Sequence, residues 1–153
     1  SRHWSFEYRD PVVGTFDLHN QHPDYDLLFH EIETAGKVAL DFGCGPGRNI
    51  VKFKGRFARI DGVDLDPINV RNAAQWALRH GCNPKLYLCN GVDLQGIPSE
   101  EYDVVFSTIC MQHICVHEIR QNYWREFCRV LKPGGWVSVQ MGFGKESENT
   151  VGY

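Results

Sequence analysis

The chain has 153 residues, of which 42% are hydrophobic, and it carries a formal net charge of −3 at pH 7. This length fits one domain, and this apolar content suits a packed core and is too high for a disordered chain. A general nucleic-acid binder would carry a strong basic excess, and no stretch approaches the ~20 apolar residues of a membrane span. We therefore expect one globular domain without a general nucleic-acid or membrane partner.

The chain divides into an N-terminal segment, residues 1–36, and a region over residues 37–153 in which strands and helices alternate. The first segment is aromatic and irregular until Pro23, which is expected to open a helix that Gly36 ends. In the second region we expect strands at Val38–Phe42, Arg59–Asp64, Lys85–Cys89, Asp103–Ser107 and Trp136–Met141. Helices are expected at Asn49–Phe53, Pro67–His80 and Val116–Leu131, with Pro133-Gly134-Gly135 breaking the chain before the last strand.

This alternation predicts an α/β fold: a doubly wound, Rossmann-like, mostly parallel sheet with helices on both faces. In such a sheet the ligand binds beyond the carboxyl ends of the strands, where the strand order reverses. The first and fourth strands flank that point. The loops Gly43–Arg48 and Ser107–His113 should therefore face each other across a pocket.

Three glycines at alternate positions, Gly43, Gly45 and Gly47, follow the first strand. They allow a tight turn and a close approach of ligand to backbone, and the next helix directs free N–H groups at that ligand. The dinucleotide fingerprint needs glycine where Arg48 stands, so a nicotinamide cofactor is disfavoured. Asp64 ends the second strand about 20 residues later, where a carboxylate accepts both ribose hydroxyls.

The pattern D-x-G-x-G-x-G of residues 41–47 resembles motif I of the class I S-adenosylmethionine-dependent methyltransferases. Four further segments resemble this family in the same order: Gly62–Asp66, Asn90–Pro98, Tyr102–Ile114 and Leu131–Gly135. The resemblance implies methyl transfer from S-adenosylmethionine, with S-adenosylhomocysteine as product. The N-P-P-[YF] tetrad of DNA-amino and glutamine methyltransferases is absent, which favours a small-molecule acceptor over a DNA base.

The resemblance also implies residue roles. Asp93 would accept from the adenine amino group, the Leu94 N–H would meet the ring, and Ser107 and Thr108 would lie beside the methionine part. Asn90 competes with Asp93, although Asn-Gly also occurs at turns for backbone reasons alone. The predicted cofactor contacts are Asp41, Gly43, Cys44, Gly45, Gly47, Asp64, Leu65, Asp93, Leu94, Ser107 and Thr108.

Methyl transfer from a sulfonium is an in-line displacement, so the protein mainly positions the two reactants, which can supply roughly 7–11 kcal/mol. The loop N–H groups suit the methionine carboxylate, and Asp41 suits its ammonium, directly or through water. His113 is the weak candidate for a general base, with packing or capping of the helix entry as its alternative role.

The six cysteines form no C-x-x-C pair and the seven histidines show no metal-ligand spacing. We therefore expect free thiols, no metal site and a reducing, cytoplasmic location. The family's sheet usually ends in a strand hairpin that this pattern lacks. The fifth strand should then have an open apolar edge, covered by further C-terminal chain or by a neighbouring subunit.

Two other functions remain open. One is a non-catalytic module that holds S-adenosylmethionine or only keeps the fold. The other is a nucleotide-dependent oxidoreductase, which the fingerprint mismatch opposes.

Overall fold

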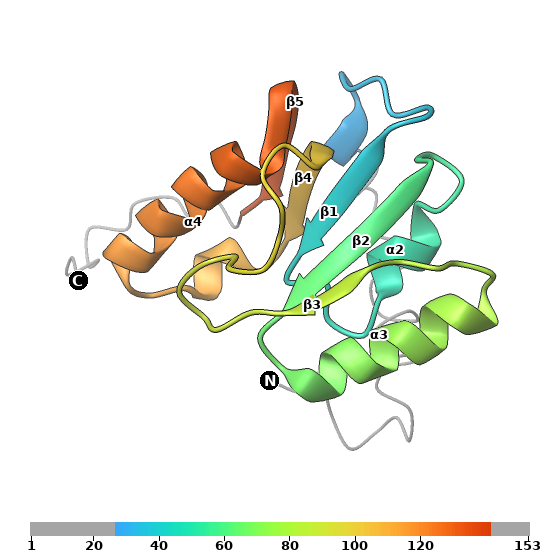
Figure 1. The fold of residues 1–153 in the computed structure, drawn as a ribbon, viewed down its shortest axis with the longest axis horizontal. Helices are drawn as coiled ribbons and strands as arrows, with labels where there is room; N and C mark the ends of the chain where they lie inside the picture. The colour runs from blue at the N-terminus through green and yellow to red at the C-terminus, as the bar shows by residue number, and fades with distance from the viewer. Residues whose placement is uncertain (1–26, 142–153) are drawn as a thin grey trace, which may run out of the picture.

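The computed structural model describes residues 27–141, in which five parallel strands form one sheet of order β3-β2-β1-β4-β5 (Figure 1). The strands are β1 (Val38–Phe42), β2 (Arg59–Asp64), β3 (Leu86–Leu88), β4 (Tyr102–Thr108) and β5 (Leu131–Gln140). The helices are α2 (Arg48–Lys52), α3 (Pro67–Arg79), α4 (His117–Val130) and the 3₁₀ helix η3 (Met111–His113). The strand order reverses between β1 and β4, so the predicted doubly wound fold is confirmed.

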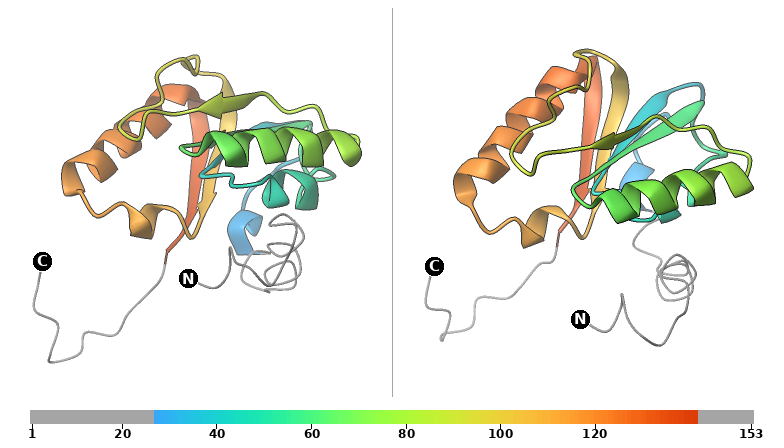
Figure 2. Two further views of the ribbon diagram at one scale, coloured as in Figure 1. Left: turned by 90° about the horizontal axis from the view of Figure 1, so that it is seen from below. Right: turned by 60° about the horizontal axis from the view of Figure 1, so that its bottom comes forward.

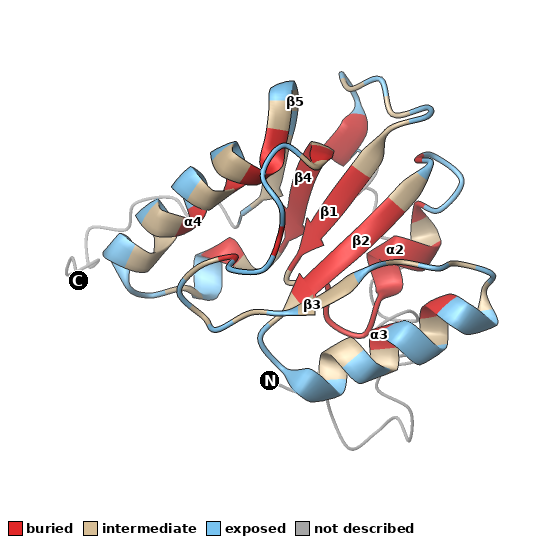
Figure 3. Cartoon of the chain, in the orientation of Figure 1, coloured by how far each residue is buried: buried red, intermediate tan, exposed pale blue. Residues whose placement is uncertain are grey.

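Helices cover both faces of the sheet, with α2 and α3 on one side and α4 on the other (Figure 2). Successive side chains of a strand point to opposite faces, and β1 shows this alternation. Ala39 belongs to the hydrophobic cluster under α2 and α3, whereas Leu40 and Phe42 belong to the cluster under α4. The central strands β1 and β4 are buried along most of their length (Figure 3). The polar residues at the carboxyl ends of β1 and β4 are therefore anchored in the buried centre of the sheet.

The predicted helix before Gly36 is not formed within the described residues; its start at Pro23 lies outside them. In the described part of this segment the structure has a 3₁₀ turn at residues 27–29, followed by turns at residues 30–31 and 35–36. Phe29 packs edge-on against Phe53 and Phe106, at ring-centroid distances of 5.0 and 5.1 Å. Insertion of this ring between the sheet and α2 fixes the chain path, and tertiary packing outweighs helix propensity.

The predicted break at Pro133-Gly134-Gly135 is an irregularity inside β5. Tyr102 pairs with Leu131, but Val104 pairs with Trp136, so extra residues bulge from β5 between the two pairs. Gly134 has φ +78°, which a bulge tolerates when the residue is glycine. Beyond the bulge, β5 is an edge strand of the described sheet. Trp136 is 48% exposed there. The cover of this edge by further chain or by a neighbouring subunit stays a prediction.

No helix within residues 27–141 combines the length and the apolar character that crossing a bilayer would require.

Candidate functional site

The glycine loop leaves the carboxyl end of β1 and is tied to β2 by hydrogen bonds. The amides of Gly43 and Cys44 both donate to the carbonyl oxygen of Val63, at 2.9 and 3.0 Å. The amide of Gly45 donates to Oδ2 of Asp64 at 2.8 Å. The amide of Gly47 donates to the carbonyl of Cys44 at 3.1 Å. These four donors are engaged within the protein, so they are not the free N–H groups that we expected.

Two of the glycines leave no room for a side chain. A Cβ at Gly43, where φ is +72°, would lie 2.5 Å from Sγ of Cys110. A Cβ at Gly47, where φ is +89°, would lie 3.0 Å from the Cα of Ala73 in α3. Positive φ and close approach are the two conditions that require glycine. The loop after β1 therefore lies beside the segment after β4, and the two are in direct contact at Gly43 and Cys110; the pocket predicted between them stays a prediction.

Asp41 is a buried carboxylate whose oxygens accept no hydrogen bond from the described residues. It is fully buried on β1, and neither of its carboxylate oxygens has a hydrogen-bond partner within the described residues. Burial raises the pKa of Asp41 to about 7, and the charge of Asp64 adds to this, while Arg48 and Asn49 act in the opposite direction. A buried polar group without a partner is costly and calls for an explanation.

Two buried polar residues at the start of α2, Arg48 and Asn49, were not among the predicted site residues. Nδ2 of Asn49 donates to Oγ1 of Thr108 at 3.0 Å, and Nη2 of Arg48 approaches the same oxygen at 3.5 Å. Ser107 donates to the carbonyl of Phe42 at 2.8 Å. The predicted residues of β4 thus fasten its end to β1 and α2. The signal was in the sequence: two polar residues directly after the last glycine of the loop.

The turn after β4 has a strained backbone that no sequence pattern indicates. Ile109 has φ +54°, which is unusual for a β-branched residue and costs about 1–3 kcal/mol. The next residue is Cys110, whose side chain lies against Gly43. Burial raises the pKa of Cys110 to about 12 and raises that of Cys44 as well. These thiols are therefore neutral packing groups rather than nucleophiles.

All six cysteines lie in the described region and are unpaired. Residues 27–141 hold no group of three or more His, Cys, Asp or Glu side chains that could hold a metal ion.

Asp64 holds the loop and the start of α3 together. Besides the amide of Gly45, it accepts from the amide of Asp66 at 2.9 Å and from Nδ2 of Asn69 at 3.2 Å, both on Oδ1. Oδ2 keeps acceptor capacity for a ligand hydroxyl, because a carboxylate oxygen has two lone pairs. Asp66 caps α3 through the amide of Ile68. The role of Asp64 toward a ribose stays a prediction.

The predicted adenine contacts lie in the loop after β3. Asn90 uses its side chain to build the turn, because its Oδ1 accepts from the amides of Val92 and Asp93. This supports the backbone role for Asn90. Leu94 is fully buried, and its amide donates to Oε2 of Glu126 at 2.9 Å. The Leu94 N–H is thus already engaged, and its contact with a ring stays a prediction.

Leu65 and His113 lie at the periphery of these groups. Leu65 is 61% exposed, and a Cβ at Gly91 would lie 3.3 Å from its Cδ1, so the loop after β3 passes beside it. His113 is exposed in η3, and its amide donates to the carbonyl of Cys110. Its role as a base stays a prediction.

A match to a family model described as a methyltransferase domain covers residues 39–135. The chain is 31% identical over 122 residues to a ubiquinone biosynthesis O-methyltransferase of Chromobacterium violaceum, covering 78% of this chain and 51% of that protein. It is 28% identical over 127 residues to a trans-aconitate 2-methyltransferase of Streptomyces avermitilis, covering 80% and 46% respectively.

A crystal structure of a SAM dependent methyltransferase from Aquifex aeolicus has the same fold. Its TM-score is 0.68 at 16% identity, over 76% of this chain and 62% of that one. The chain spans about half the length of the curated relatives it matches.

Proposed function

Because the chain belongs to the class I S-adenosylmethionine-dependent methyltransferase family, we propose that it binds S-adenosylmethionine at the carboxyl ends of β1 and β2. It then transfers the methyl group to a small-molecule acceptor. Residues 37–153 form the cofactor-binding domain in this proposal, and residues 1–36 help to cover the acceptor site.

The observation that carries the proposal is the buried, unpartnered carboxylate of Asp41. The ammonium of the cofactor's methionine part would supply both hydrogen-bond donors and a positive charge, which restores the ionised form of this acid. The glycines at positions 43 and 47 let the loop lie close to Cys110 and Ala73, which fixes its path at the end of β1, beside Asp41.

Two further carboxylates could accept hydrogen bonds from the ribose and adenine parts of the cofactor. Asp64 retains lone pairs on Oδ2 for the ribose hydroxyls, and the half-buried Asp93 suits the adenine amino group. Leu65, exposed between these two acids, offers apolar surface to the nucleoside. When bound, S-adenosylmethionine supplies a methyl group on a sulfonium that is already a good leaving group. The residues of this chain orient that group, and His113 remains the candidate that removes a proton from the acceptor.

A small-molecule acceptor is supported by the names of two relatives, an O-methyltransferase of ubiquinone biosynthesis and a trans-aconitate 2-methyltransferase. The free state of the six cysteines supports the expected reducing, cytoplasmic location. A covering element over the β5 edge, from the same chain or from a neighbouring subunit, completes the proposal.

The test is calorimetric titration of the purified chain with S-adenosylhomocysteine, and with NAD in parallel. We expect micromolar binding of the former only, lost in Asp64→Ala and weakened at least tenfold in Asp41→Asn. Glu31→Gln serves as the control, because it removes an exposed carboxylate outside the site. A folded chain that binds neither ligand would support the scaffold reading and end the proposal.

The acceptor is tested separately by transfer of a labelled methyl group from S-adenosylmethionine to a panel of small acids, phenols and amines. Label in a small-molecule product supports the proposal. Label found only in added protein or RNA would overturn the small-molecule part, and cofactor binding without any transfer would identify a non-catalytic binding module.

A further inference from the structure

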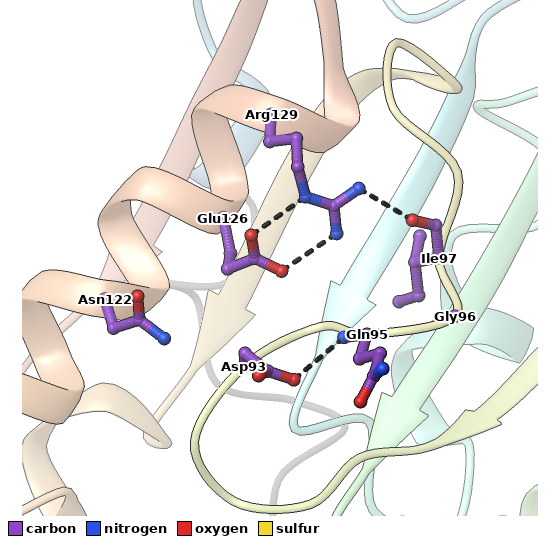
Figure 4. A pocket seen from close by; sticks show the side chains of 7 residues that line it. All are labelled: Asp93, Gln95, Gly96, Ile97, Asn122, Glu126 and Arg129. Carbon is purple, nitrogen blue, oxygen red and sulfur yellow. Dashed lines mark hydrogen bonds and ion pairs between the residues drawn. The ribbon is translucent and has the colours of Figure 1, made fainter.

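The loop Asn90–Ile97, which carries Asp93, has no helix or strand of its own and is held by α4. Figure 4 shows Asn122, Glu126 and Arg129 projecting from successive turns of α4 toward this loop. Such a loop owes its shape to its partners, because it has no ladder of backbone hydrogen bonds.

Arg129 and Glu126 bind the loop through its backbone. The guanidinium of Arg129 donates to the carbonyl of Ile97 at 2.8 Å and to that of Leu94 at 3.1 Å. Glu126 accepts from the amide of Leu94 at 2.9 Å. One turn earlier, Nδ2 of Asn122 donates to the carbonyl of Val92 at 2.7 Å. Four backbone groups of one short loop are thereby satisfied by three side chains of one helix.

The two charged residues also fix each other. Nε and Nη2 of Arg129 donate to the two carboxylate oxygens of Glu126, each at 2.8 Å. This bidentate geometry is available to arginine and not to lysine. The ion pair lowers the pKa of Glu126 and raises that of Arg129, so both remain charged near neutral pH. Because Arg129 is about one-third exposed, the ion pair by itself contributes little to stability, and its geometry matters more.

These side chains line a cavity of about 470 Å³ together with Asp93, Gln95, Gly96 and Ile97. Two charged residues of its wall, Glu126 and Arg129, are engaged with the loop backbone and with each other (Figure 4). We therefore interpret these side chains as the contact by which α4 holds the loop, rather than as the wall of a second ligand site.

Hydrogen bonds within the loop that α4 holds fix one oxygen of Asp93. Oδ1 of Asp93 accepts from Nδ2 of Asn90 at 2.9 Å and from the amide of Gln95 at 3.0 Å. Oδ2 makes no hydrogen bond with any residue between 27 and 141. The side chain is therefore anchored through one oxygen, and the other is presented as an acceptor by the loop that α4 holds.

We propose that Arg129 and Glu126 are positioning residues that hold the loop Asn90–Ile97 so that Oδ2 of Asp93 selects adenine by accepting from its amino group. This inference rests on the proposed function, because it assigns a specificity device to the same cofactor site. Arg129 and Glu126 do not touch the cofactor, and their effect passes through Asp93.

The test compares binding of S-adenosylhomocysteine with that of S-inosylhomocysteine, in which a carbonyl replaces the amino group of adenine. A site built around one charge-assisted hydrogen bond should prefer the adenine ligand by about tenfold or more. We expect Asp93→Asn and Arg129→Ala each to reduce this preference below about threefold, and the double variant to reduce it no further, because both act on one contact.

The control is Lys132→Ala, which removes the ion pair with Asp103 and leaves the loop intact. This variant should keep the full preference. Arg129→Lys retains the charge without the bidentate fork, so it should recover part of the preference. If Arg129→Ala does not fold, as judged by circular dichroism, Glu126→Gln decides, since it keeps the side-chain volume and weakens the fork.

The outcomes separate this inference from the proposed function. A wild-type chain that fails to bind S-adenosylhomocysteine would end both. Binding without preference between the two ligands would overturn the role of Asp93. A preference retained in Arg129→Ala, with both ligands weakened equally, would overturn the positioning role and leave only a contribution to the fold.

Discussion

Replacing Asp41 with asparagine should remove a pH-dependent loss of stability from the free chain and weaken its binding of S-adenosylhomocysteine. The wild-type carboxylate lies fully buried without a hydrogen-bond partner, so its ionised form is disfavoured in the folded state. Asparagine has nearly the same shape and carries no charge. The cost of a buried charge disappears, but so does the group that would pair with the ligand's ammonium.

The magnitude follows from the pKa of Asp41, which burial raises from 3.8 to about 7. Between these two pH values the folded chain retains a proton that the unfolded chain has released, so the free energy of unfolding falls as the pH rises. At ~1.36 kcal/mol per pH unit the whole shift corresponds to about 4 kcal/mol, of which about 2.5 kcal/mol is lost between pH 5 and pH 8. Asparagine does not titrate, so its variant lacks this loss.

The assay is urea unfolding followed by circular dichroism at pH 5, 6, 7 and 8. The stability of Asp41→Asn relative to the wild type should increase by about 2.5 kcal/mol between pH 5 and pH 8. The buried asparagine amide also carries a free-energy cost, but this cost is the same at every pH and cancels when the values at pH 5 and pH 8 are compared. With S-adenosylhomocysteine present, the wild type should bind about tenfold more tightly at pH 8 than at pH 6, because Asp41 is then ionised. Equal pH slopes for variant and wild type, with Glu31→Gln as reference, would refute this reasoning.

Three other substitutions test the supporting structure by urea unfolding. Gly43→Ala should lower the free energy of unfolding by about 2 kcal/mol or more, because its Cβ would lie 2.5 Å from Sγ of Cys110 at φ +72°. Adding Cys110→Ala to this variant should recover part of the lost stability, and no recovery would count against the contact between the two residues. Tyr102→Phe removes the 3.0 Å hydrogen bond to Asp61 and should cost about 1–2 kcal/mol while leaving the Kd of S-adenosylhomocysteine unchanged. Phe127→Ala should cost about 3–5 kcal/mol, since the ring is fully buried under the sheet, and a loss below about 1 kcal/mol would contradict this packing.

Local sequence patterns predicted the bounds of an element correctly where residues at its own ends determine them. β1 and β2 have the predicted bounds, Val38–Phe42 and Arg59–Asp64. β1 is mainly apolar and ends where the glycine loop begins, and β2 ends at Asp64, directly before the start of the next helix. The N-cap at Asp66 followed by Pro67 likewise fixed the start of α3.

The errors arose where distant residues compete with local preference. The segment before Gly36 has helical periodicity, but the aromatic cluster around Phe29 and the hydrogen bond from Ser138 to the carbonyl of Leu28 fix another path. The glycines at 134 and 135 looked like a break in the chain. The pairing of β5 with β4 incorporates them as a bulge, since a strand pair tolerates extra residues when its register resumes beyond them.

By itself the sequence determined the fold class, the family and the identity of most of the candidate residues, because these depend on periodicity and on residue types at fixed spacing. Only the tertiary structure decided what those residues do to one another. It showed that the amides of Gly43, Cys44 and Gly45 donate to residues of β2, and that the Leu94 N–H donates to Glu126. It also showed that Asp41 alone of the site acids is buried without a partner. Hydrogen-bond partners and burial are properties of chain segments brought together by the fold, and no local pattern encodes them.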